Sequence, residues 1–199
     1  MLKMIKRIRK KSCCNYFIDS LKYIRESRNY IYFVTVIFIF FGIIGFLFPI
    51  LFVEQVKLLL EQLLKQTGGL NTPSLIGFIF LNNLKASFFG LALGILFGFV
   101  PVILAVVNGY VLGFVSNYAV ENAGFSSLFR LLPHGIFELP AVMISMGLGI
   151  KLGMFFFSKN SDKEFMRRVW LSLKVFICII VPLLIIAAII EGSLIGLLK

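Results

Sequence analysis

The feature that most constrains this chain is a predominantly apolar tract of 48 residues at positions 73–120. One helical crossing of a bilayer takes about 20 residues, because each residue rises about 1.5 Å and the hydrocarbon core is about 30 Å thick. The tract is therefore too long for one crossing and predicts two. Pro101 is the strongest break inside it, so we place these spans at about 75–99 and 102–120.

Three further apolar stretches are long enough to cross the same core, at about 30–53, 136–157 and 169–190. Hydrophobic residues make up 59% of the 199 residues and charged residues only 15%, more apolar surface than a soluble domain can bury. We therefore predict an all-α fold, a polytopic membrane helix bundle with about five transmembrane helices. Residues 30–199 form its single transmembrane domain, and residues 1–29 form a basic cytoplasmic segment. This composition argues against a disordered chain and against a soluble enzyme.

The segments between the spans have patterns of their own. Residues 54–68 alternate leucines with Glu and Lys at helical spacing, which predicts a short amphipathic helix on the outer surface or packed on the bundle. Residues 16–28 mix aromatic and basic side chains and fit either an interfacial helix or a solvated tail. We expect residues 121–135 to form a mixed, partly re-entrant loop and residues 158–168 to form a polar loop.

Positive charge is unevenly distributed along the chain. The net charge is +11, and nine of the 20 Lys and Arg residues lie within the first 28 positions. Four more, Lys159, Lys163, Arg167 and Arg168, lie in the segment 158–168. Basic residues beside apolar spans stay in the cytoplasm, and five crossings place both segments on that side. We therefore predict a multi-pass protein of the cell membrane with a cytoplasmic N-terminus and no nucleic-acid partner.

Polar side chains at membrane depth are the candidate functional residues, because one of them in hydrocarbon costs a few kcal/mol unless it is paired or reaches water. The predicted intramembrane polar cluster contains Asn82, Asn83, Lys85, Asn108, His134 and Glu138. His134 and Glu138 are four residues apart and share one helical face. Three interpretations of Glu138 stay open: a carboxylate at a helix N-terminus, a buried partner of Lys85, or a group that transfers a proton.

Metal and cofactor chemistry finds little support in the residue pattern. His134 is the single histidine, and we interpret it as a hydrogen-bonding residue that orients a neighbour. Cys13, Cys14 and Cys178 lack the spacing of zinc ligands or of a disulfide framework. We expect no metal, no cofactor and no catalytic residue.

Small residues at four-residue spacing predict where helices approach each other closely, since they let a neighbouring backbone pack against them. The helix-packing glycines expected on this basis are Gly90, Gly94, Gly98, Gly109, Gly113, Gly149 and Gly153. Ser87 and Ser145 are interpreted as small packing residues of the same kind.

Several motifs recur here in a recognisable order. They are Asn82-Asn83 with Ala86, the Gly90/Gly94/Gly98 ridge, Asn108-Gly109 with Gly113, and Pro133-His134-Gly135 followed by Glu138-Leu139 and Ala141. Together they resemble the stage II sporulation protein M family over about residues 30–190. The resemblance implies a small membrane protein with about five spans and no catalytic residues. In endospore formers it implies a complex with peptidoglycan-degrading partners that supports membrane migration during engulfment, and the family also occurs in organisms that do not sporulate.

These observations lead to one main functional hypothesis. We expect a non-enzymatic scaffold or subunit of an envelope-associated membrane complex. Its expected partners are the lipid bilayer and other membrane or envelope proteins, and a homo-oligomer is compatible with the sequence. The alternative is a transporter or channel subunit with a polar site around Lys85, Asn108 and Glu138. An intramembrane enzyme that uses His134 and Glu138 as acid and base has less support, because the sequence offers no nucleophile or metal to accompany them.

Overall fold

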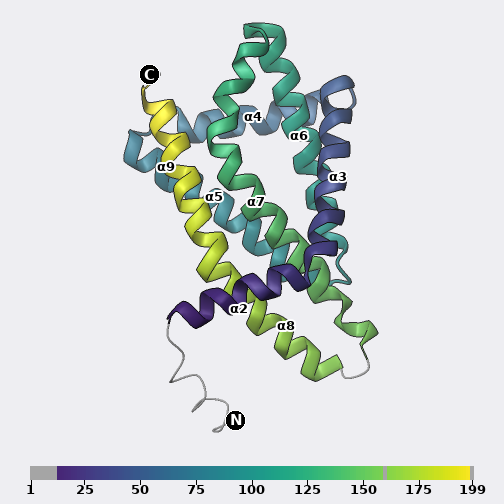
Figure 1. Ribbon diagram of the computed structural model, residues 1–199. Helices are drawn as coiled ribbons and strands as arrows, with labels where there is room; N and C mark the ends of the chain where they lie inside the picture. Colours follow the sequence, from purple (N-terminus) through teal and green to yellow (C-terminus); the bar gives the residue numbers. More distant parts are fainter. Residues whose placement is uncertain (1–12, 159–160, 198–199) are drawn as a thin grey trace.

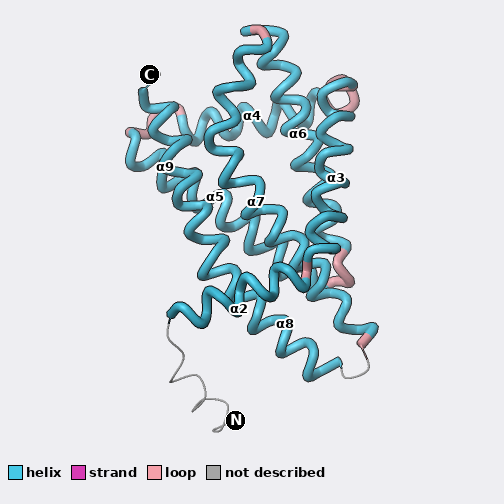
Figure 2. Tube along the Cα trace, viewed as in Figure 1, coloured by secondary structure: helices cyan, strands magenta, loops and turns pink. Residues whose placement is uncertain are grey.

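The computed structural model describes residues 13–158 and 161–197, and nearly all of them are helical (Figures 1 and 2). The α-helices are α2 (Cys13–Glu26), α3 (Arg28–Leu47), α4 (Val53–Thr67), α5 (Thr72–Ala92), α6 (Phe99–Ala123), α7 (Leu128–Gly153), α8 (Ser161–Val175) and α9 (Val181–Leu197). Short 3-10 helices η1, η2 and η3 cover Leu93–Ile95, Phe125–Ser127 and Met154–Phe157, and a π-helical turn, η4, covers Phe176–Ile180. No strand occurs within the described ranges.

Five helical runs in the described part of the chain are long and apolar enough to cross a membrane. They are Arg28–Leu47, Thr72–Ile95, Phe99–Ala123, Gly135–Phe157 and Ser161–Gly196. The all-α bundle with about five spans is therefore confirmed, and so is the amphipathic helix after the first span, which is α4. The last run has 36 residues, about 54 Å of helix, so the charged first half of α8 extends beyond a hydrocarbon core of about 30 Å.

The break between the second and third spans lies earlier than predicted. It falls at 93–98, where η1 is followed by Phe97 at φ +52° and Gly98 at φ +76°. Glycine adopts this left-handed conformation at little cost, so the chain reverses at Gly98. Pro101 is instead the third residue of α6, where its missing N–H has no partner within the helix.

The expected loops are also largely helical. Of residues 121–135, only four separate α6 from α7, because α6 ends at Ala123, Gly124 follows it with φ +74°, and α7 begins at Leu128. The turn therefore lies at Gly124, and Pro133 and Gly135 are included within α7. This hairpin projects beyond the other helices at the top of Figure 1. Of residues 158–168, those from Ser161 onward belong to α8, because acidic side chains in its first turn favour a helix start.

The fifth span is also longer than its predicted range of 169–190. Helix α8 continues through η4 into α9, which extends to Leu197. Pro182 is the second residue of α9 and directly follows the π-helical turn. A proline removes one backbone hydrogen bond from a helix, and a wider turn beside it accommodates this loss without ending the helix.

The two ends of the bundle carry different short helices. Helix α2 lies across the end where α8 begins, and α4 crosses the opposite end, near the C-terminus (Figure 1). Residues 16–26 are therefore helical, as one of the two interpretations of this segment expected, and their place at a membrane interface stays a prediction. Tyr23 of α2 joins a core cluster with residues of α5, α7 and α9, so α2 is attached to the bundle through its buried face.

Glycine positions mark the closest helix approaches. A Cβ placed on Gly94 would meet the backbone of Gly149, and one on Gly153 would meet the backbones of Gly94 and Gly98. These contacts bring η1 and the end of α5 against α7. On the other side of the bundle, a Cβ on Gly109 or Gly113 would meet the backbone of α3 at Phe38 or Gly42. Each of these pairs of helices thus packs backbone against backbone.

Candidate functional site

The predicted polar cluster is divided in the structure. Asn83 of α5 and Glu138 of α7 come together, with the Asn83 amide within hydrogen-bonding reach of the Glu138 carboxyl. Lys85 is exposed on α5 and makes no ion pair among the described residues, so a Lys85–Glu138 pair is absent from this part of the chain. Asn108 is exposed on α6, where its amide donates to the Leu104 carbonyl of the same helix at 2.7 Å. The side chain of His134 lies outside the described residues.

A cavity of about 440 Å³ surrounds the part of the cluster that does assemble. Its polar lining includes Asn82, Asn83 and Glu138 together with Glu191 of α9. The C-terminal end of α4 covers it with apolar side chains such as Leu63 and Leu64. Two carboxylates and two amides therefore share one space between α5, α7 and α9, at the end of the bundle where α4 lies.

Glu191 was not among the sequence-predicted site residues. Its charge acts on Glu138 across the cavity, although 53 positions separate the two residues in the chain. The available signal was a lone carboxylate near the end of the last apolar helix, in the segment AAIIEGSL. No pattern of spacing connects such a residue to α7, so only the fold reveals the pair.

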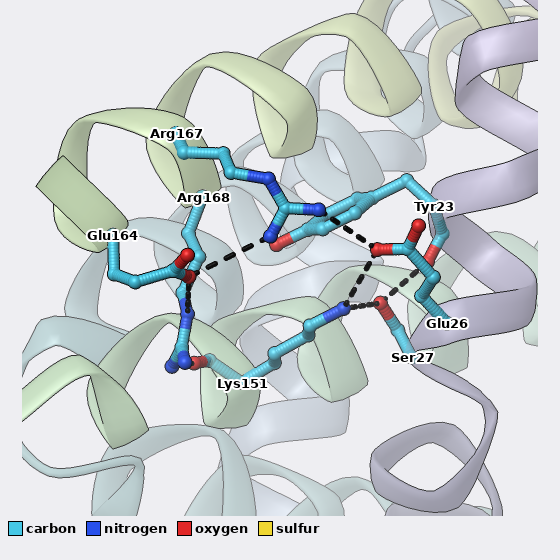
Figure 3. A network of polar contacts seen from close by, with 7 residues as sticks. All are labelled: Tyr23, Glu26, Ser27, Lys151, Glu164, Arg167 and Arg168. Atoms are coloured by element: carbon cyan, nitrogen blue, oxygen red, sulfur yellow. Dashed lines mark hydrogen bonds and ion pairs between the residues drawn. The ribbon is translucent and has the colours of Figure 1, made fainter. Parts of the chain in front are cut away.

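A second polar site lies at the opposite end of the bundle and joins α2, α7 and α8 (Figure 3). At its centre, Lys151 of α7 is about nine-tenths buried. Its Nζ donates to Ser27 Oγ at 3.0 Å, lies 4.0 Å from the centroid of the Tyr23 ring, and lies 3.9 Å from Glu26 Oε2. The charge is thus met by a hydroxyl, an aromatic face and a carboxylate. We call this set of contacts, with the arginines described next, the Lys151 network.

Two arginines of α8 complete the Lys151 network. Arg167 bridges Glu26 at 3.2 Å and Glu164 at 3.5 Å, so it connects α2 with the first turn of α8. Arg168 pairs with Glu164 at 3.2 Å and donates from Nη1 to the carbonyl of Lys151 at 2.7 Å. That carbonyl lies in the last turn of α7, where carbonyls lack partners within the helix. The arginines therefore bind both the partner carboxylates and a free helix end.

Two other residues of the Lys151 network, Tyr23 and Ser27, are also shielded from solvent. Tyr23 and Ser27 are fully buried, and Ser27 Oγ donates to the Tyr23 carbonyl at 2.6 Å. Burial raises the pKa of the Tyr23 hydroxyl above its ordinary value of 10.0, and the charges of Arg168 and Arg167 oppose this shift. The phenol is therefore neutral at physiological pH. Lys151 was not among the predicted site residues, and its one signal in the sequence was its position as a lysine within the fourth apolar stretch.

Among the described residues, no group of three or more His, Cys, Asp or Glu side chains is arranged to hold a metal ion. The Lys151 network is compact and internally paired, which suits a structural joint. The Glu138 cavity has room beside its polar groups, which suits a small polar or charged guest.

The fold and the two sites define a multi-pass helical membrane protein with small extramembrane helices at both ends. Residues 34–194 match the family model described as Stage II sporulation protein M, and the chain belongs to this family. The resemblance found from the Asn, Gly and Glu motifs is therefore confirmed over most of the chain.

The curated relatives add no described activity. Two of them are uncharacterised proteins of Methanocaldococcus jannaschii. One is 37% identical over 84 residues, which is 41% of this chain and 45% of the relative. The other is 33% identical over 123 residues, which is 58% of this chain and 53% of the relative. The chain thus spans about half the length of the curated relatives it matches, and no solved structure matches it.

Proposed function

We propose that this protein is a non-enzymatic membrane scaffold, or a subunit of an envelope-associated complex, and that α2 and α8 form its partner-binding platform. The Lys151 network is the observation that carries this proposal. It joins α2 and α8 to the end of α7 through a nearly buried charge and two bridging arginines. A scaffold needs an extramembrane surface that is held rigidly relative to its spans, and this network supplies such an attachment.

The test is affinity purification from crosslinked native membranes, followed by mass spectrometry. We compare wild type with Lys151→Met, which removes the central charge, and with Glu138→Gln at the opposite end as the matched control. The expected result is a reproducible set of membrane or envelope proteins with wild type and Glu138→Gln, and a reduced set with Lys151→Met. A preparation that contains only this chain would count against a scaffold, whether the chain is a monomer or a homo-oligomer.

We further propose that the platform faces the cytoplasm. Helices α2 and α8 lie at the same end, and the segments 1–29 and 158–168 hold 13 of the 20 basic residues. Single cysteines at Lys163 and Gln66, in a chain whose native cysteines are replaced by serine, test this with a membrane-impermeant maleimide. We expect Gln66→Cys to react in intact cells and Lys163→Cys to react only after permeabilisation. The reverse labelling would overturn the orientation.

A second candidate is a transporter or channel subunit, and the Glu138 cavity favours it. The polar site that supports it contains Asn82, Asn83, Glu138 and Glu191, without the exposed Lys85 and Asn108. We expect purified protein in sealed vesicles to conduct protons or a small cation, with Glu138→Gln abolishing the flux and Lys85→Gln leaving it unchanged. Equal flux in wild type and Glu138→Gln would exclude this cavity as the path.

A further inference from the structure

A groove of about 750 Å³ runs between α2 and α8 at the end of the bundle that holds the Lys151 network. Its apolar lining includes the Tyr23 ring, Met166, Trp170 and Leu171. Met166 and Trp170 are well exposed, at 64% and 44%. Charged side chains from both helices surround this apolar lining. The groove therefore combines a surface for a hydrocarbon chain with a charged rim.

The unbalanced charge of the groove is mainly positive. Asp19 pairs with Lys174 at 3.5 Å, and Glu26 pairs with Arg167 at 3.2 Å, so these carboxylates are neutralised within the protein. Lys22 and Lys163 also line the groove, and neither makes an ion pair within the part of the chain that the structure describes.

One lining carboxylate, Asp162, makes no ion pair among the residues that the structure describes. It lies in the first turn of α8, where the positive end of the helix dipole stabilises its negative charge. The two unpaired lysines outnumber this carboxylate, so the charge that remains for a ligand is net positive and favours an anion.

We expect the groove to lie at the level of the lipid head groups. Helix α8 continues into the last span, so Trp170 lies about 10 Å further along the helix axis, toward that span, than Lys163, which is seven residues earlier. Helix α2 lies across the end of the bundle (Figure 1). It exposes Phe17, Ile18 and Leu21. Tryptophan is typical of the interface, and basic pockets between helices at this level bind anionic head groups.

We propose that the groove between α2 and α8 binds one anionic phospholipid. The head-group phosphate lies near Lys22 and Lys163, and an acyl chain follows Met166 and Trp170 toward the hydrocarbon. This site adds a lipid ligand to the platform and does not depend on the platform binding a protein. Exposed lysines contribute to anionic lipid binding chiefly through charge, so each one is expected to change the affinity by about fivefold.

The chain supplies its own probe, because Trp170 is the single tryptophan. The full-length protein is reconstituted in vesicles that contain brominated phosphatidylglycerol or brominated phosphatidylcholine at equal mole fraction. Bromine quenches tryptophan on contact, so quenching reports which lipid occupies the groove. We expect half-maximal quenching at an about 25-fold lower fraction of phosphatidylglycerol, because each of the two lysines contributes about fivefold. In Lys22→Gln/Lys163→Gln, this preference is expected to vanish.

The matched control is Lys57→Gln/Lys65→Gln, which removes the same charge from exposed positions of α4 at the opposite end. This control is expected to retain the lipid preference. Equal quenching by both lipids, or an equal loss in the control, would overturn the proposal. Inorganic phosphate that abolishes the preference at millimolar concentration would identify a free-anion site instead. Absence of preference, together with protein crosslinks from Lys163 in native membranes, would assign the groove to a protein partner.

Discussion

The two ends of the bundle both contain charged side chains near the membrane, and they accommodate them differently. At the end formed by α2 and α8, Lys151 is met by a hydroxyl, an aromatic ring and a carboxylate. At the end covered by α4, Glu138 and Glu191 share a cavity with two amides. At the first end, side chains of opposite charge connect α2, α7 and α8. At the second end, two carboxyl groups and two amides border a cavity of about 440 Å³. The first arrangement holds helices together, and the second leaves space between them.

The largest effect on both ends is expected from a substitution that disturbs the helix bundle between them. A leucine at Gly94 would have to fit where the backbone of Gly149 lies, so α5 and α7 would separate. We expect Gly94→Leu to destabilise the protein by about 3 kcal/mol or more, at the upper end of overpacking effects. Size-exclusion profiles and denaturant titration in detergent measure the loss.

The neighbouring Leu93→Ala is the control for this change. Leu93 is 40% exposed, so its truncation leaves no large cavity, and we expect a cost below about 1 kcal/mol. Equal stability of the two variants would show that Gly94 faces lipid and does not contact α7.

Lys151→Met is the next largest change and acts on one end alone. Methionine fills a similar volume but loses the charged hydrogen bond to Ser27 and the cation–π contact with Tyr23. We expect a destabilisation of about 2 kcal/mol, the typical value of a buried charged hydrogen bond. Because α2 loses an attachment, trypsin should also cleave faster at Lys22 and Arg25. Lys57→Met on α4 should leave the cleavage rate in α2 unchanged.

Local features of the sequence predicted most of the fold. A span is recognised by its own length and hydropathy, so the five crossings and α4 followed directly from the residues. The ends of the helices were harder to predict, because they depend on which glycine or proline forms the turn. Gly98 and Gly124, with positive φ, mark the turns that Pro101, Pro133 and Gly135 were expected to mark.

The sites were harder to predict because they depend on contacts between distant residues. Asn83 and Glu138 were both selected as polar residues at membrane depth, but Glu191 joins them only through the packing of α9. Likewise, Lys151 and Ser27 are 124 positions apart, and each looks ordinary in its own segment. Lys85 and Asn108 were selected by the same rule and lie outside the cavity, because helix rotation decides which polar side chains face inward.

Glu138→Gln tests whether the polar residues at the end covered by α4 contribute to stability. The amide keeps the shape of the side chain and its reach to Asn83, and it removes the ionisable carboxyl group beside Glu191. We expect the stability to change by no more than about 1 kcal/mol in either direction, since the side chain keeps its size and any lost repulsion from Glu191 offsets a weaker hydrogen bond. Denaturant titration of both variants compares the free energy of unfolding lost in Glu138→Gln with that lost in Lys151→Met. A loss as large as that of Lys151→Met would mean that Glu138 is also a structural residue.

Asn108→Ala should have the smallest effect, because this residue belongs to neither end. Among the described residues, its amide donates only to the carbonyl of Leu104 on its own helix, and its side chain is exposed. Its removal exchanges one local hydrogen bond and leaves the cavity and the Lys151 network unchanged, so we expect a change of about 0.5 kcal/mol or less. The same titration measures it, with crosslinking to read the oligomeric state. A loss above about 1.5 kcal/mol, with weaker crosslinks, would show that Asn108 contacts a second copy. The bundle would then have a third polar site that forms only between chains.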